Sequence, residues 1–156
     1  MPAKVRLAQS GHLSQDRPGE AEFREMNDFQ SLALPTEPVA LAPDGTQVRV
    51  LLALGRGSLA HFELPAGAVS HAVKHRTVEE IWYFLSGRGE VWRADDKRQV
   101  IEPVGPGVSL TIPLGTAFQF RAVGAEPLVF LAITMPPWPG EEEAFRLAGP
   151  WTPSLP

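Results

Sequence analysis

Short runs of alternating apolar and polar residues dominate the sequence from Thr46 onward. Alternation with a period of two is typical of β-strands that bury one face. Turn-forming residues separate most of the runs, for example at positions 55–57, 87–89, 95–96 and 113–115. The nine runs are TQVRVLLAL, SLAHFEL, AVSHAVKH, EIWYFLS, EVWRA, RQVIEPV, VSLTIPL, AFQFRAV and PLVFLAITM.

Nine strands with such short connections leave no room for helical crossovers, so the pattern predicts an all-β, antiparallel sandwich or barrel over residues 46–135. Residues 1–45 are polar and carry five prolines, and we expect them to form an irregular N-terminal arm. Within the arm, residues 20–34 are compatible with a short helical turn or with a segment that wraps the barrel. Residues 136–156 form a short C-terminal tail rich in proline and tryptophan. We expect its Trp138 and Trp151 segments to pack across the outer face of the barrel or on a partner subunit, with one helical turn over residues 141–146.

Composition narrows the class of protein further. A length of 156 residues fits one domain, and 14 glycines with 16 prolines exclude a helical bundle. The net charge of −4 provides no basic surface for nucleic acid or anionic lipid. The chain has no cysteine, no apolar run of about 18 residues and no signal-peptide pattern, so we expect a cytoplasmic protein that does not span a membrane.

The candidate chemistry lies in three histidines and the carboxylates that follow them. His61, His71 and His75 fall in or beside the first predicted strands, whereas His12 belongs to the polar arm and is expected to be solvated. Glu80 follows closely, and histidine with carboxylate on adjacent strands could hold a divalent first-row metal ion.

Two stretches of the sequence resemble the signatures of the cupin superfamily. They are residues 67–87, GAVSHAVKHRTVEEIWYFLSG, and residues 107–118, GVSLTIPLGTAF. The matching positions are His75, Glu80 and Gly87 in the first stretch and Gly107, Pro113 and Gly115 in the second. The resemblance implies a double-stranded β-helix, or jelly-roll barrel, and it implies a homodimer, because small cupins are often dimers.

The resemblance also implies where a metal would bind and how this chain departs from that pattern. The family site usually has three histidines and one glutamate, of which this chain keeps His75 and Glu80. Val73 and Phe118 stand at the other two ligand positions. His71 lies about 13 Å from His75 along an extended strand, too far to share one ion with it. We therefore consider His61, on a preceding strand, as the third ligand in an incomplete site for Zn, Ni, Mn or Fe.

Four aromatic residues are predicted to face the interior. Trp82 and Phe84 share the face of Glu80 by strand alternation, and Phe118 and Phe120 share the face of the missing histidine. Two interpretations remain open for them. They form a packed core, or they line a cavity that stacks a flat or apolar ligand with His75 and Glu80 as its polar anchors.

These observations favour a cupin-fold protein of unknown substrate that binds a small molecule in the aromatic-lined barrel, with an incomplete metal site. The first alternative is a metal-dependent cupin enzyme of the isomerase or epimerase, decarboxylase or dioxygenase type, which uses His75, Glu80 and another ligand such as His61. A second alternative is a metal-free acid–base enzyme in which His75 is the general base.

Overall fold

The computed structural model describes residues 28–38 and 40–156, and the regular secondary structure in this part of the chain is almost entirely β-strand. The nine predicted runs correspond to β2 through β10. His12 and most of residues 20–34 lie outside the described residues, and residues 28–34 contain no helix. The strands are β1 Ala40–Leu41, β2 Gln47–Leu54, β3 Gly57–Leu64, β4 Ala72–His75, β5 Glu79–Ser86, β6 Arg88–Ala94, β7 Gln99–Val104, β8 Ser109–Ile112, β9 Ala117–Val123, β10 Leu128–Met135 and β11 Ala144–Leu147.

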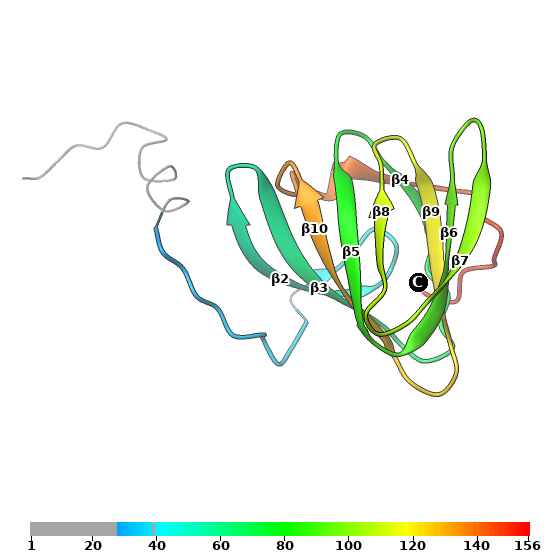
Figure 1. Cartoon of the computed structure of the whole chain (residues 1–156), viewed down its shortest axis with the longest axis horizontal. Helices are drawn as coiled ribbons and strands as arrows, with labels where there is room; N and C mark the ends of the chain where they lie inside the picture. The colour runs from blue at the N-terminus through cyan, green and yellow to red at the C-terminus, as the bar shows by residue number, and fades with distance from the viewer. Residues whose placement is uncertain (1–27, 39) are drawn as a thin grey trace, which may run out of the picture.

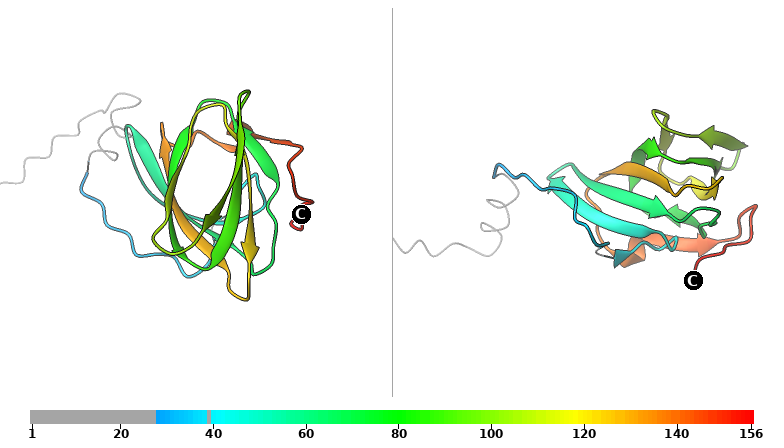
Figure 2. Two further views of the ribbon diagram at one scale, coloured as in Figure 1. Left: turned by 45° about the vertical axis from the view of Figure 1, so that its right-hand side comes forward. Right: turned by 90° about the horizontal axis from the view of Figure 1, so that it is seen from below.

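Two antiparallel sheets face each other and enclose a common interior (Figures 1 and 2). Sheet A has the strand order β1-β2-β3-β10-β5-β8, and sheet B has the order β11-β4-β9-β6-β7. Strands adjacent in a sheet are mostly distant in sequence, as in β10, which lies between β3 and β5. This is the all-β, antiparallel jelly roll that the sequence predicted.

Strand β5 shows how the alternation positions the later site. Its residues are alternately buried and exposed, so that Glu80, Trp82 and Phe84 point into the barrel. Ile81 and Tyr83 point to the outer face of sheet A. The predicted inward face of β5 is therefore confirmed, and a carboxyl group is buried next to two large rings.

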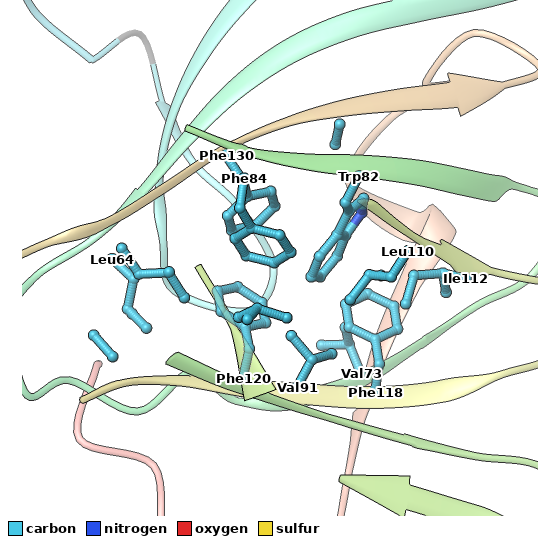
Figure 3. Close-up of a cluster of buried hydrophobic side chains, with 14 of the residues drawn as sticks. Leu64, Val73, Trp82, Phe84, Val91, Leu110, Ile112, Phe118, Phe120 and Phe130 are labelled. Carbon is cyan, nitrogen blue, oxygen red and sulfur yellow. The ribbon is translucent and has the colours of Figure 1, made fainter. Parts of the chain in front are cut away.

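Aromatic rings from both sheets meet in the centre of the core (Figure 3). The indole of Trp82 stacks on the ring of Phe130, with 4.4 Å between ring centroids. The rings of Phe118 and Phe120 on β9 meet the same indole edge-on, each at 5.3 Å. Each fully buried large side chain contributes about 2 to 3 kcal/mol by leaving water, so this cluster is the main support of the barrel.

A glycine is required where the chain leaves sheet A for sheet B. Gly87, between β5 and β6, has a φ of 77°, and a Cβ atom there would collide with the backbone carbonyl of Pro127. Both the left-handed backbone and the close approach exclude other residues.

The C-terminal tail is part of the barrel. The predicted helical turn covers only Glu141–Glu143, a 3₁₀ turn, because at Ala144 the chain becomes strand β11 and pairs with the free edge of β4. Trp151 packs on the outside of sheet B, where the Arg121 guanidinium lies 4.4 Å from its ring centroid. No helix in the described part of the chain is long and apolar enough to cross a membrane.

Candidate functional site

His75 and Glu80 lie at the same end of the barrel. His75 is the last residue of β4, Glu80 is the second residue of β5, and a short turn joins the two strands. Both side chains point inward, with relative exposures of 6% and 5%. A chain of contacts connects them, because the His75 ring meets the ring of Phe118, Phe118 meets Trp82, and Trp82 bonds to Glu80.

The carboxyl group of Glu80 is held by one indole. The Nε1–H of Trp82 donates to its Oε2 at 2.6 Å. Burial raises the pKa of Glu80, the hydrogen bond from Trp82 lowers it and the negative charge of Asp44 raises it, so that the pKa is about 8. At neutral pH this carboxyl group is mostly protonated, so it can donate a hydrogen bond.

The imidazole of His75 lies between two aromatic rings. Phe118 and Trp138 each meet it edge-on with 5.1 Å between ring centroids. Burial lowers the pKa of His75 to about 4, although the negative charge of Glu143 acts in the opposite direction. Its Nδ1 atom is buried without a hydrogen-bond partner among the described residues. A neutral imidazole with an unused polar atom is therefore kept at this end of the barrel.

A segment that sequence reasoning did not place here covers His75. Residues 136–143, which we call the strap, run from the end of β10 across this end of the barrel. The backbone N–H of Trp138 donates to Ser58 Oγ at 3.0 Å, and that hydroxyl also bonds to the hydroxyl of Thr134. Trp138 thus packs against His75 at the barrel end, and the expectation that it packs across the outer face is corrected.

Glu143 fixes the far end of the strap. Its carboxylate accepts the backbone N–H groups of Thr77 and Val78, each at 2.6 Å, and the hydroxyl of Thr77 at 2.8 Å. Burial would raise the pKa of Glu143, but these hydrogen bonds outweigh it and lower the pKa below the usual value. The strap is therefore bound to the turn that separates β4 from β5. Only the run of prolines around Trp138 marks this segment in the sequence.

The family metal set is not assembled. Val73 and Phe118 are cross-strand neighbours, each 1% exposed, and they fill the two missing ligand positions with apolar groups. Among the described residues no three His, Cys, Asp or Glu side chains are grouped so that they could hold a metal ion. With one imidazole and one carboxyl group that is mostly protonated, the donors present do not fit a tightly bound first-row metal.

The structure corrects the placement of His61. Phe62 and Leu64 of β3 pack in the core, so their neighbour His61 points to the outer face of sheet A. There it lies in register between Arg49 of β2 and Leu131 of β10. His61 therefore lies on the wrong side of the sheet to complete a site with His75 and Glu80.

The four predicted pocket aromatics form a packed core. All four side chains are 2% exposed or less, namely those of Trp82, Phe84, Phe118 and Phe120. The ring of Phe130 fills the space between them, and this residue was not predicted from the sequence. Of the two interpretations left open, the geometry supports dense packing.

Two cavities lie at the surface and are lined by other residues. One, of about 500 Å³, is at the strap end of the barrel and is lined by Gly55, Arg56, Thr77, Glu79, Leu114, Met135 and Pro136. The other, of about 280 Å³, is lined by Arg93, Ala94, Asp95, Arg98, Val100, Glu102, Thr111, Pro113 and Thr116. The lining of the first cavity includes Thr77 of the β4–β5 turn, Glu79, which precedes Glu80 in sequence, and Pro136, the first residue of the strap.

Comparisons with known proteins agree with this architecture. A family profile described as a cupin domain matches residues 60–134. The uncharacterized protein MJ1618 of Methanocaldococcus jannaschii is 32% identical over 107 residues, which are 65% of this chain and 82% of that protein. The crystal structure of BH2720 from Bacillus halodurans is 23% identical, with a TM-score of 0.55 over 60% of this chain and 73% of that one. The oxalate decarboxylase of Bacillus subtilis, studied for its Mn(II) centres, is 21% identical, with a TM-score of 0.59 over 72% of this chain and 30% of that one.

Proposed function

This chain belongs to the cupin superfamily, and we propose that it binds a small organic molecule at the strap end of the barrel, beside His75 and Glu80, without a tightly bound metal ion. The observation that carries the proposal is the buried Nδ1 atom of His75, which has no hydrogen-bond partner among the described residues. A buried polar atom without a partner costs about 1 to 3 kcal/mol, and proteins keep such groups where a function uses them.

The strap explains how a ligand reaches these groups. The indole of Trp138 covers the His75 ring, and the strap is tied to the barrel through Ser58 at one end and Glu143 at the other. Displacing the indole while Glu143 stays bound opens the end of the barrel next to the 500 Å³ cavity. The strap then acts as a cover that the ligand replaces.

The paired groups favour a particular class of ligand. A neutral imidazole offers an acceptor, and the protonated carboxyl group of Glu80 offers a donor. A small hydroxy acid presents both complementary groups, because its hydroxyl can donate to the imidazole and its carboxylate can accept from the carboxyl group. The neighbouring structures include an oxalate decarboxylase with Mn(II) centres, but the likeness is one of fold, and the metal ligands of the family pattern are half replaced here by Val73 and Phe118.

Metal content tests the first part of the proposal. After purification without chelator, elemental analysis is expected to find far less than one Zn, Ni, Mn or Fe per chain. Stoichiometric metal that is lost in His75→Ala and retained in the outer-face control His61→Ala would instead support a metal-dependent cupin enzyme.

Ligand binding tests the second part. Formate, oxalate, lactate and glycolate are titrated while thermal unfolding and tryptophan fluorescence are recorded. We expect at least one of these acids to stabilise the protein and to lose that effect in His75→Ala and Glu80→Gln, with His61→Ala unchanged. The proposal would be contradicted if no acid stabilised the wild type. It would also be contradicted if every acid stabilised the wild type and the three variants equally.

A further inference from the structure

The smaller of the two cavities lies between the end strands of the two sheets. Strand β8 ends sheet A and strand β7 ends sheet B, both on the same side of the barrel (Figure 1). The cavity has a volume of about 280 Å³, and β6, β7 and β8 contribute to its lining together with the turns beside them. We call it the edge cavity. Its lining and that of the strap-end cavity share no described residue, so the two are separate places on the molecule.

Arg93 of β6 brings a positive charge from sheet B into the edge cavity. It lies in register with Phe118 of β9, whose side chain is buried in the core, so both side chains are on the inner face of the sheet. The Arg93 Nη1–H donates to the backbone carbonyl oxygen of Thr111 on β8 at 2.9 Å and so joins the two sheets. The side chain is only 22% exposed, and its Nε–H is buried without a hydrogen-bond partner among the described residues. A guanidinium in such a place requires an anionic group within hydrogen-bond distance.

The carboxylates of the lining do not come that close to the arginines. Arg93 Nη2 lies 3.6 Å from Glu102 Oε2, and Arg98 Nε lies 3.7 Å from Asp95 Oδ2. Charge-assisted N–H···O bonds are normally about 2.7 to 2.9 Å long. Two guanidinium groups and two carboxylates therefore line one cavity, and neither pair is drawn together into a hydrogen-bonded ion pair.

The charges of the lining select a ligand that carries both signs. The two positive and two negative side chains sum to zero, so a simple anion that approached Arg93 would also meet the carboxylate of Glu102. A zwitterion avoids this repulsion, because its carboxylate can accept two donors of Arg93 while its ammonium group donates to Glu102. One long contact between Arg93 and Glu102 is then replaced by two short ones.

The remaining lining fits a short aliphatic group. Val100 and Pro113 add apolar surface beside the charged side chains. A volume of about 280 Å³ is at the lower end of the range for small-molecule sites, which is roughly 300 to 1,000 Å³. We propose that the edge cavity binds a free α-amino acid with a small aliphatic side chain, its carboxylate on Arg93 and its ammonium group on Glu102. This site is additional to the proposed hydroxy-acid site and does not depend on it.

Calorimetric titration of the full chain with L-valine tests the class of ligand. Valine is expected to bind with a Kd below about 1 mM. Isovalerate lacks the ammonium group and isobutylamine lacks the carboxylate, and each is expected to bind at least about tenfold more weakly than valine. Absence of valine binding, or an analogue that binds as tightly as valine, would overturn the proposal.

Single substitutions test the place of binding. Arg93→Gln and Glu102→Gln are each expected to weaken valine binding by about tenfold or more. Because Arg93 also joins the sheets, Glu102→Gln is the decisive variant, since the side chain of Glu102 is 46% exposed and the fold does not depend on it. The matched control is Glu90→Gln, which removes the carboxylate that bonds Arg121 at 3.0 Å on the outer face of the same sheet. It is expected to leave valine binding unchanged.

The His75→Ala chain distinguishes this site from the strap end of the barrel. Valine is expected to bind it as tightly as it binds the wild type. Loss of valine binding in His75→Ala would place the amino acid at the strap end and overturn the present inference, while the proposed function would stand. Equal losses in Glu102→Gln and Glu90→Gln would overturn it as well.

Discussion

Replacing Glu80 by glutamine tests the central electrostatic feature of the barrel. In the folded chain burial raises the pKa of Glu80 from its usual value of 4.5 to about 8. Glutamine has nearly the same shape as the protonated carboxyl group and can still accept the Trp82 N–H. The substitution therefore removes the ionisation and keeps the packing.

The magnitude follows from proton linkage. Between pH 4.5 and about 8 the folded state keeps a proton that the unfolded state releases, so the raised pKa of Glu80 makes stability fall as pH rises. The slope is about 1.4 kcal/mol per pH unit, which amounts to about 3 kcal/mol between pH 5.5 and 8 and then levels off. His75 has the opposite effect, because its lowered pKa makes stability rise with pH between about 4 and 6.5. Above pH 6.5 the effect of His75 on stability no longer changes with pH, so the fall in stability caused by Glu80 is not offset by His75.

The assay is urea unfolding followed by tryptophan fluorescence at several pH values from 5.5 to 9. Asp44 and Glu143 also have shifted pKa values, but they are present in both proteins, so the difference between variant and wild type reports on Glu80. The stability of Glu80→Gln relative to wild type is expected to increase by about 3 kcal/mol from pH 5.5 to 8. The exposed neighbour serves as control, and Glu79→Gln is expected to follow the wild type.

Parallel pH profiles for Glu80→Gln and wild type would refute this reasoning. They would mean that the carboxyl group ionises in the folded chain much as it does in water. A relative stability of the variant that falls from pH 5.5 to 8 would refute it as well, because the negative charge would then be stabilising.

Three further predictions concern the strap and the missing ligands. Glu143→Ala leaves two backbone N–H groups of the β4–β5 turn without an acceptor. The substitution is expected to lower the unfolding free energy by about 3 kcal/mol, measured by urea unfolding. A loss below about 0.5 kcal/mol would show that water replaces the carboxylate. Trp138→Ala uncovers the His75 ring, so the pKa of His75 is expected to rise from about 4 toward 6.5 in an NMR titration. An unchanged pKa would mean that Trp138 does not control the burial of His75. The double variant Val73→His with Phe118→His restores the family ligand set on two paired strands. Calorimetry is expected to show that it binds Zn²⁺ or Mn²⁺ at least tenfold more tightly than wild type does. An unchanged affinity would contradict the assigned ligand positions.

The fold could be predicted well from the sequence because its signal is local. Alternation in the β5 run fixes which side chains face inward, and Glu80, Trp82 and Phe84 were placed correctly from it. The two glycine-bounded signatures then distinguished one jelly roll from other all-β arrangements. β1 escaped prediction because two residues are too few to show a period, and β11 overlaps residues 141–146, which were expected to form a helical turn.

The site was less predictable, because it depends on which strands become neighbours. His61 was considered as a ligand because it lies on a preceding strand, but Phe62 and Leu64 occupy the inward positions of β3, so His61 points outward. Likewise, the contact of Trp138 with His75 joins residues more than sixty positions apart. No local sequence pattern predicts such a contact. The spacing of residues along the chain therefore could not show that Trp138 covers His75 or that side chains fill the centre of the barrel.

The position of β10 has a consequence for how the protein is made. β10 lies between β3 and β5, and the carboxylate that caps the β4–β5 turn belongs to Glu143. A nascent chain emerging from the ribosome therefore holds the β2–β3 hairpin and the β5–β8 pair as separate pieces until residues 128–135 have been synthesised. Closure of the barrel therefore has to wait for β10, and the edges of β3 and β5 that face it stay unpaired while the strands between them are made.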